Sequence, residues 1–205
     1  AGPRRAHRPR RTAADDAMAP WLNPLPSMRP MGRSADPNSF QRLDLSRDLE
    51  LPVAPHCGAF GFVRRHHTHE GVDLYAPPGA EVAAVEPGTV VRVEEFTGPK
   101  AGSPWWHDTD AVLVEGPTGV VCYGEIRADQ ALEPGQAVAA GQVLGAVTPV
   151  LREDKGRPGC MLHLELYAEG YRGPTAEWEQ AERPEGLMDP TPHLLHLFAG
   201  SGGAA

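Results

Sequence analysis

The densest group of side chains able to do chemistry is a histidine-rich stretch in the first half of the chain. His66, His67 and His69, three of the nine histidines, fall within four residues, and Asp73 follows His69 by four positions. On an extended strand side chains alternate between faces, so residues 69, 71 and 73 share one face, and Gly71 leaves space between the imidazole and the carboxylate. Such a pair suits a zinc ion, which takes nitrogen and oxygen ligands at about 2.0–2.2 Å. By itself the pattern is equally typical of a solvated loop that enters a strand.

A strand expected over residues 160–166 supplies a further imidazole. Alternation places Met161, His163 and Glu165 on one face and apolar side chains on the other, which suits packing on a core. A histidine on such a face is commonly a satisfied core residue. Beside the His69 and Asp73 pair, however, His163 is the third ligand type that a catalytic zinc site requires. Glu165 is then suited to accept the other N–H of a ligand histidine and to fix its tautomer.

The composition limits the classes of protein and partner. The chain has 205 residues, 40% hydrophobic residues and a formal net charge of −8, so one packed domain with extensions is expected. The negative charge argues against nucleic acid as the main partner, because phosphate binding requires clustered Lys and Arg. No apolar run approaches the roughly 20 residues of a membrane span. The basic N-terminus lacks an apolar segment, so no standard secretory signal is expected.

Three regions are expected along the chain. Residues 1–48 are rich in Pro, Arg, Ala and Asp and predict an extended or disordered arm that docks near Trp21; residues 1–17 are a tag, a processed end or a mis-set start. Residues 49–170 carry short strands with turn signals about every 8–12 residues, which predicts a mainly β domain, an antiparallel β-sandwich. Residues 171–205 predict a C-terminal extension with short helices, one over 175–183 and a capped turn over 189–195.

Several motifs in this order resemble one enzyme family. H-x-G-x-D-L-Y-A-P-x-G begins at His69, a strand–turn–strand series with G-x-V repeats follows, and H-L-E begins at His163, so that roughly residues 58–167 are covered. Together they resemble the M23 peptidases, the lysostaphin- and LytM-like zinc endopeptidases that cut peptide cross-links in bacterial peptidoglycan. The resemblance implies an M23/LytM-type β-sandwich, Zn²⁺ held by His69, Asp73 and His163, and a fourth position left for water. It also implies a peptidoglycan peptide as substrate and an extracellular or periplasmic location.

Two positions depart from the family pattern. The family's H-x-H motif begins with a histidine that helps to activate water, and Met161 stands in that place. The family's Y-x-H motif corresponds to Tyr123-Gly124-Glu125, so a glutamate replaces a second histidine. A thioether cannot move a proton at neutral pH, whereas a carboxylate can. The expected mechanism therefore has Glu125 as the general base and the Tyr123 hydroxyl helping to stabilise the oxyanion. Alternatively, Glu125 pairs with a nearby arginine such as Arg127.

A long polar loop over residues 97–110 carries candidate substrate-binding residues. Trp105 and Trp106 are suited to wall a peptide groove, although one of them is equally suited to plug the edge of the sandwich. His107 is a candidate to replace a missing proton carrier, and otherwise a solvated loop residue.

Two further functions compete with a peptidase. The first is a pseudoenzyme of the same fold that holds zinc and binds a wall peptide or a protein partner without cleaving it, which the loss of both accessory histidines favours. The second is a biotinyl- or lipoyl-type carrier, because residues 87–90 and 140–143 resemble the hairpins of that architecture. A carrier needs a modifiable lysine on a tight hairpin, and Lys155 lacks the E-x-M-K-M context. Stoichiometric zinc separates the carrier from the other two.

Overall fold

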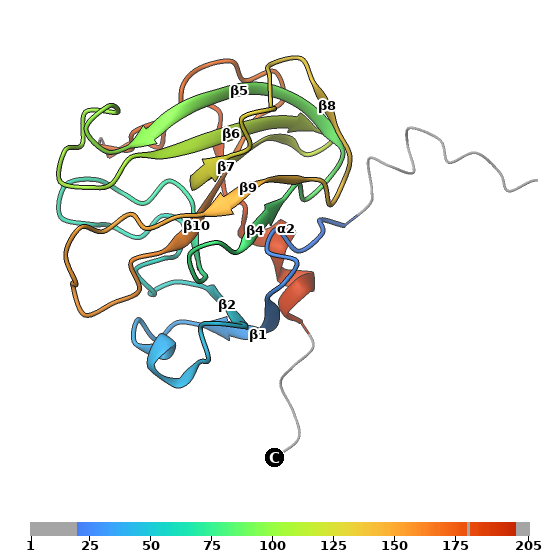
Figure 1. Ribbon diagram of the computed structural model, residues 1–205. Helices are drawn as coiled ribbons and strands as arrows, with labels where there is room; N and C mark the ends of the chain where they lie inside the picture. The colour runs from blue at the N-terminus through green and yellow to red at the C-terminus, as the bar shows by residue number, and fades with distance from the viewer. Residues whose placement is uncertain (1–19, 180, 200–205) are drawn as a thin grey trace, which may run out of the picture.

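A computed structural model describes residues 20–179 and 181–199 (Figure 1). It confirms the prediction of a mainly β, antiparallel architecture. The elements in chain order are β1 (Arg29–Ser34), η1 (Ser39–Arg42), β2 (Asp48–Pro52), β3 (Val72–Tyr75), β4 (Glu81–Ala83), β5 (Gly88–Thr97), β6 (Thr109–Gly116), β7 (Gly119–Ala128), β8 (Ala137–Val138), β9 (Val143–Val147), β10 (Met161–Tyr167), β11 (Leu187–Met188), α2 (Thr191–Leu194) and η2 (Leu195–Phe198).

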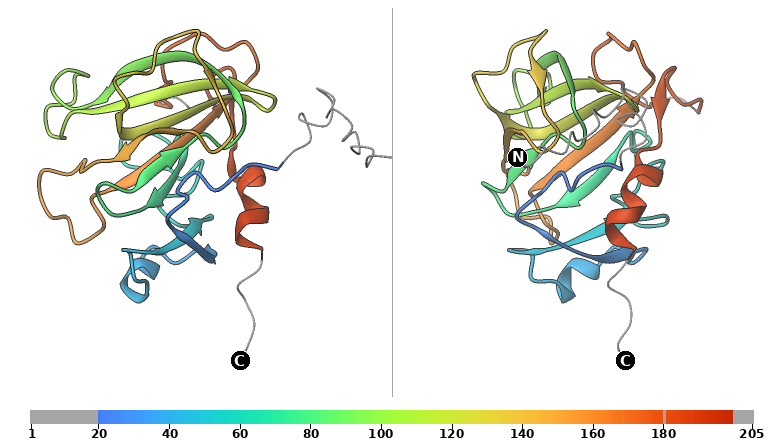
Figure 2. Two further views of the ribbon diagram at one scale, coloured as in Figure 1. Left: turned by 45° about the vertical axis from the view of Figure 1, so that its right-hand side comes forward. Right: turned by 90° about the vertical axis from the view of Figure 1, so that its right-hand side faces the viewer.

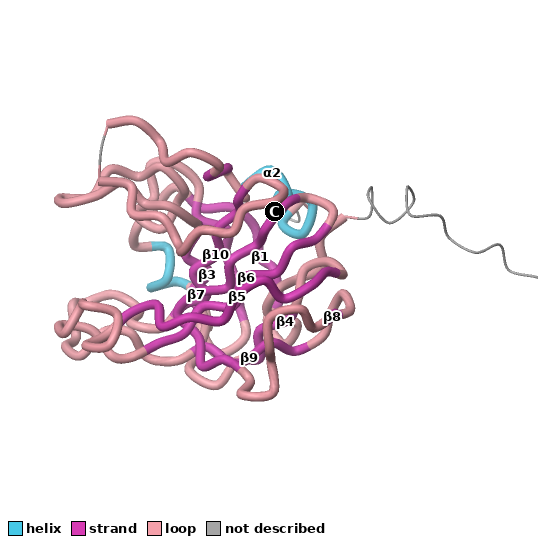
Figure 3. The backbone as a smooth tube through the Cα atoms, turned by 90° about the horizontal axis from the view of Figure 1, so that it is seen from above, coloured by secondary structure: helices cyan, strands magenta, loops and turns pink. Residues whose placement is uncertain are grey.

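The main sheet has nine strands, and β10 lies inside it. Its longest path runs β11-β10-β7-β6-β5-β8, while β3 also pairs with β10 and β9 joins β4 to β7. Seen from above, the strands lie at the centre and most loops project around them (Figure 3). All seven residues of β10 are buried, because the strand has β7 on one side and both β3 and β11 on the other. The sheet therefore holds β10 in a fixed register against β3.

The two faces of β10 pack differently, as strand alternation predicts. Leu162, Leu164 and Leu166 point into the main hydrophobic core, whereas Tyr167 belongs to a second apolar cluster on the opposite face. Burying a leucine side chain stabilises the fold by about 1.5–3 kcal/mol. Three such residues fix which way the strand faces, because a slip of one residue would exchange its two faces. His163 and Glu165 are thereby held on the face opposite the main core.

The N-terminal segment is folded from residue 20 onward, where an extended or disordered arm was expected. β1 pairs with β2 in parallel, unlike the antiparallel strands of the main sheet. Trp21 is buried, and its ring stacks on His193 of α2 at a centroid distance of 4.8 Å. Figure 2 shows α2 and η2 beside this segment. The arm is ordered because the C-terminal extension covers it; residues 1–19 lie outside the described residues.

The C-terminal extension contains the predicted helical turn near residue 191 but lacks the other predicted helix. Residues 175–179 and 181–183 form no helix, so that prediction is wrong, and residue 180 lies outside the described residues. A helix needs its backbone N–H groups for internal hydrogen bonds. Here side chains of the β domain accept hydrogen bonds from these N–H groups instead. Thr175 N–H donates to Glu94, Ala176 N–H to Tyr167 and Trp178 N–H to Glu70.

The three cysteines, Cys57, Cys122 and Cys160, are unpaired. No helix among the described residues is long and apolar enough to cross a membrane.

Candidate metal centre and cleft

Three side chains from distant parts of the chain converge beside β10. His69 lies in the loop before β3, Asp73 lies on β3, and His163 on β10 is the strand partner of Asp73. Oδ1 of Asp73 is 3.0 Å from Nε2 of His69 and 2.9 Å from Nδ1 of His163, and the two ring nitrogens are 3.1 Å apart. All three residues are buried, with 0%, 4% and 6% of their surface exposed. The structure thus brings together the three ligands named from the sequence.

The donor atoms of this cluster fit a zinc ion. Two nitrogens and a carboxylate oxygen are a common ligand set for catalytic zinc, and a tetrahedral ion with ligands at 2.0–2.2 Å needs donors about 3.3 Å apart. One ligand atom from each of the three residues lies within 4.8 Å of the others. Since three residues supply three donors, a fourth coordination position remains for a water or substrate oxygen.

Hydrogen bonds behind the cluster fix the tautomers of both histidines. Nδ1 of His69 lies 2.9 Å from the carbonyl oxygen of Ala59, and Nε2 of His163 lies 2.9 Å from Oε1 of Glu165. Both oxygens only accept hydrogen bonds, so these two nitrogens carry the protons. The lone pairs of the neutral rings are then on Nε2 of His69 and Nδ1 of His163, the two atoms that face Asp73. Glu165 occupies the position that the sequence analysis assigned to it.

Gly71 lets β3 and β10 approach at this point. A Cβ atom on residue 71 would lie 2.5 Å from the carbonyl oxygen of Leu164 and 2.9 Å from Nε2 of His163. Real Cβ contacts are longer, so any side chain here would push the His163 ring or the strand away. The glycine of the H-x-G-x-D motif therefore makes room for the third ligand from a distant strand.

Arg64 completes the surroundings of Asp73, and no spacing in the sequence indicated it. Its Nη2 donates to Oδ2 of Asp73 at 2.7 Å and to the carbonyl oxygen of Cys57 at 3.1 Å. The guanidinium thus holds one carboxylate oxygen and leaves Oδ1 directed to the two histidines. Arg64 lies on a hairpin closed by the Val63–Thr68 bridge, so only the folded loop brings it to the site.

The charges of the cluster depend on each other. Burial opposes ionisation of Asp73, but His69 and Arg64 hold the pKa of its carboxyl well below the usual value. Burial also disfavours a charged His163, yet its hydrogen bonds to Asp73 and Glu165 raise its pKa well above the usual value. Burial lowers the pKa of His69. The metal-free cluster therefore keeps a proton on His163 next to Asp73, and a metal ion must displace it, so metal affinity is expected to fall at low pH.

The cluster opens into a small, solvent-open cleft whose walls come from β3, β7, the start of β10 and three loops, which connect β2 to β3, β5 to β6 and β9 to β10. In Figure 1 the three loops project from one side of the sheet, on the left. The cleft is lined by Arg64, Asp73, Tyr75, Trp106, Glu125, Val150, Leu151, Arg157, Pro158 and Met161. Tyr75 was not singled out from the sequence, although it shares the strand face of Asp73 two positions earlier. Burial is the main cause that raises the pKa of its hydroxyl.

Glu125 reaches the cleft because β7 bulges at Gly124–Glu125. On β6, Val112 pairs with Tyr123 and Asp110 pairs with Ile126, so two residues of β7 stand opposite one residue of β6. Glu125 has φ 62°, a left-handed conformation that a non-glycine residue adopts at some energetic cost. Bulges of this kind redirect a side chain and are common beside active sites.

The Glu125 carboxyl group is poised to exchange a proton. Its Oε2 atom is buried and has no hydrogen-bond partner among the described residues. Burial, with the nearby charge of Asp73, raises the pKa of Glu125 to about 7. No ion pair joins Glu125 to Arg127 among the described residues; Arg127 is exposed. The alternative in which Glu125 only balances that arginine is therefore wrong.

Tyr123 does not line the cleft, and the role in catalysis assigned to it from the sequence is wrong. Its side chain is fully buried in the main hydrophobic core, and its hydroxyl accepts a hydrogen bond from the backbone N–H of Val85 at 2.8 Å. Regular alternation would put residues 123 and 125 on one face, but the bulge between them breaks the period. Tyr123 therefore faces the core, while Glu125 faces the cleft.

Replacing Tyr123 by phenylalanine is expected to affect stability rather than activity. The change leaves the buried Val85 N–H without its partner, which costs about 1–3 kcal/mol in the free energy of unfolding. Denaturant unfolding would measure that loss, and peptide hydrolysis by the same preparation should stay within about two-fold of the wild type. A large fall in kcat without loss of stability would restore a catalytic role for the hydroxyl.

The three predicted substrate-binding residues separate in the structure. Trp106 lines the cleft, and its position is fixed by the Trp106–Leu151 bridge. Trp105 is 63% exposed and meets Trp106 edge-on, with the ring centroids 6.2 Å apart. His107 is exposed and is not among the residues that line the cleft. Of the three, only Trp106 can therefore contact a peptide inside the cleft.

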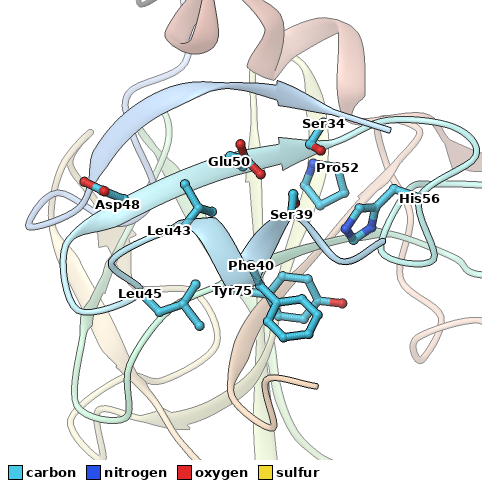
Figure 4. A pocket seen from close by; sticks show the side chains of 10 residues that line it. All are labelled: Ser34, Ser39, Phe40, Leu43, Leu45, Asp48, Glu50, Pro52, His56 and Tyr75. Atoms are coloured by element: carbon cyan, nitrogen blue, oxygen red, sulfur yellow. The ribbon is translucent and has the colours of Figure 1, made fainter. Parts of the chain in front are cut away.

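A separate pocket of about 280 Å³ lies under the N-terminal segment. Figure 4 shows its lining residues, which come from β1, η1, β2 and the residues that follow them, with Tyr75 on its wall. Tyr75 thus separates this pocket from the cleft. Oε2 of Glu50 is buried there without a hydrogen-bond partner among the described residues.

Comparisons with known proteins agree with this architecture. The profile of Peptidase family M23 matches residues 67–173, just over half of the chain. Among solved structures, the chain is similar to Helicobacter pylori Csd3, at 23% identity over 64% of this chain and 34% of that chain, with a TM-score of 0.39. It is also similar to the catalytic domain of the antimicrobial peptidase lysostaphin from Staphylococcus simulans, at 17% identity over 67% of this chain and 88% of that one, with a TM-score of 0.45.

A third similar structure is a mutant of the catalytic domain of the prophage-encoded M23 protein EnpA from Enterococcus faecalis, at 22% identity over 65% of this chain and 85% of that one, with a TM-score of 0.43. The chain spans only about a third of the length of Csd3. A search of curated protein sequences gives no match. Because the matched segment covers more than half of the sequence, the chain belongs to peptidase family M23.

Proposed function

We propose that the chain is a Zn²⁺-dependent endopeptidase that cleaves the short peptides of peptidoglycan, with His69, Asp73 and His163 as the metal ligands. The observation that carries the proposal is the pair of hydrogen bonds to the outer ring nitrogens, which leaves Nε2 of His69 and Nδ1 of His163 as the ring nitrogens that face Oδ1 of Asp73. Membership of family M23 supports peptide hydrolysis at the level of the family. The wall peptide as substrate rests on the family alone.

In this proposal the protein positions the substrate and moves the proton, and Glu125 is the base. Its partnerless Oε2 atom lies in the cleft that Asp73 also lines, and its pKa of about 7 lets it accept a proton from water near neutral pH. Zn²⁺, when bound, supplies Lewis acidity and lowers the pKa of water to about 7. Tyr75 and Trp106 form walls against which a peptide backbone can lie.

A second candidate is an M23-like pseudoenzyme that binds zinc and a peptide without cleaving it. Met161 favours it, because this thioether lines the cleft where the sequence analysis places a family histidine that helps to activate water. A thioether can neither donate nor accept a proton at neutral pH. Of the two positions that depart from the family pattern, Met161 and Glu125, only Glu125 can accept a proton.

Metal removal tests the proposal. The purified full chain is expected to contain about one zinc per molecule and to hydrolyse wall fragments or oligoglycine peptides; a chelator should abolish the activity and added Zn²⁺ should restore it. His163→Ala should weaken zinc binding by more than about 100-fold, since losing a ligand costs more than losing an outer partner. The matched control is His66→Ala, because His66 is exposed in the same histidine-rich stretch.

Two results would contradict the proposal. Zinc binding with no hydrolysis of any peptide would favour the pseudoenzyme. A wild-type protein that holds no stoichiometric metal under any loading condition would rule out both candidates.

A further inference from the structure

Basic and acidic side chains both lie at the mouth of the cleft in a protein that is acidic as a whole. The chain carries a formal net charge of −8. Nevertheless, one loop beside the cleft carries Arg64 and Arg65, and the loop on the other side carries Arg152, Lys155 and Arg157. Three loops form walls of the cleft: they connect β2 to β3, β5 to β6 and β9 to β10. All three project from the same side of the sheet (Figure 1). A ligand that enters the cleft therefore passes basic side chains on both sides, although the second loop also carries Glu153 and Asp154.

Some of the other charges at this mouth have partners, whereas Arg65 and Lys155 are exposed. Arg64 is paired with Asp73. Nε of Arg152 donates to the carbonyl oxygen of Trp106 at 2.7 Å, which fixes this loop against the tryptophan loop. On the acidic side, Oδ1 of Asp154 accepts the backbone N–H of Gly156 at 2.8 Å and so stabilises the turn before Arg157. Glu153 is exposed on the same loop.

Arg157 differs from these residues, because it lines the cleft and is not used by the fold. Its side chain is exposed, and it has no ion pair or side-chain hydrogen bond among residues 20–179 and 181–199. It lines the same wall as Pro158 and Met161, and its positive charge acts on Glu125 and Tyr75 across the cleft. A guanidinium in this position is available to a ligand that reaches the proton acceptor.

We propose that the cleft selects peptides that carry a carboxylate close to the scissile bond and that Arg157 binds this carboxylate. The inference rests on the proposed function and names its substrate class. A guanidinium matches a carboxylate with two parallel hydrogen bonds. Asp73 and Glu125 are acidic but lie deeper in the cleft, so the carboxylate is held near the rim and an uncharged backbone segment reaches the centre.

The test uses glycine-rich pentapeptides that carry a single Glu at each position in turn, each matched by the same peptide with Gln. At one position or more, the wild type should show a kcat/KM about ten-fold higher for the Glu peptide, because the bidentate pair of a guanidinium with a carboxylate is replaced by a hydrogen bond from the guanidinium to a neutral amide oxygen. Arg157→Gln should remove that preference, so that the Glu and Gln peptides have equal kcat/KM in the variant. Arg127→Gln is the control, since Arg127 is exposed on β7 outside the cleft lining.

The two proposals fail in different ways. If no peptide is hydrolysed, the proposed function fails, and calorimetric titration of the zinc-loaded protein with the Glu and Gln peptides still decides this inference. About ten-fold tighter binding of a Glu peptide, reduced by Arg157→Gln and by about 0.5 M salt, would support it. Equal kcat/KM and equal affinity for the Glu and Gln peptides at every position would overturn it, as would an equal preference in the Arg157→Gln protein.

Discussion

Replacing Glu125 by glutamine is expected to lower kcat for peptide hydrolysis by about 10²–10⁴-fold, the usual contribution of a general base. Glutamine has nearly the same shape but cannot accept a proton at neutral pH. Glu125 is not a member of the metal cluster, so zinc content should stay at the wild-type level. Stopped assays on a peptide series, together with metal analysis of the same preparations, measure both quantities.

The pH dependence provides a second measurement of the same group. The base acts in its ionised form, and burial raises the pKa of Glu125 to about 7, so the rate should rise with pH up to about neutrality and then level off. The positive charge of a bound metal lowers that pKa, so the midpoint should lie at or below pH 7. Glu133→Gln is the control, because Glu133 is exposed. A Glu125→Gln protein that retains more than about a tenth of the activity would remove Glu125 from the mechanism.

Replacing Glu165 by glutamine is expected to weaken zinc binding by about 10–100-fold, as found when the outer partner of a metal-binding histidine is lost. Glu165 is buried, with one oxygen bonded to Nε2 of His163 and the other to the hydroxyl of Tyr167. The neutral amide accepts the histidine proton less strongly, so Nδ1 becomes a weaker ligand. The glutamine side chain also turns an N–H group toward the hydroxyl oxygen of Tyr167. That oxygen already accepts a hydrogen bond from the backbone N–H of Ala176.

Competition with a chromophoric chelator measures this change without relying on activity. Tyr167→Phe is the graded variant: it keeps the Glu165–His163 hydrogen bond but removes the second hydrogen bond of Glu165, together with the acceptor of the Ala176 N–H, and should shift zinc affinity in the same direction but less. Glu169→Gln is the neutral control, since Glu169 is exposed just after β10. Zinc affinity that is unchanged in Glu165→Gln would mean that His163 is oriented without this carboxylate.

Strand period explains why His163 and Glu165 could be placed on one face from the sequence, whereas His69, Asp73 and His163 were named together as ligands through the resemblance to the family motifs. His163 faces away from the main core because three leucines at alternate positions of β10 face toward it. The same period put Glu165 next to its ring. In the sequence, Gly71 indicated a position where space is left beside the backbone. The structure shows that the His163 ring and the carbonyl oxygen of Leu164 lie against this glycine.

The same reasoning failed where the strand stopped being regular. Tyr123 and Glu125 were expected to act together, but the bulge at Gly124–Glu125 turns one to the core and the other to the cleft. The helix predicted over 175–183 failed for a related reason. Its backbone N–H groups are used by side chains that lie far away in the sequence, and local propensity does not include such partners.

The sequence alone determined the mainly β fold, the three candidate metal ligands and the outer partner of His163, because these depend on residue type and on a two-residue period that buried apolar side chains enforce. Only the tertiary structure decided that Arg64 holds Asp73, that Glu125 is aimed into the cleft without Tyr123, and that Trp106 rather than Trp105 or His107 lines it. These depend on how loops and a bulge are held by contacts between distant segments, and no short stretch of sequence carries that information.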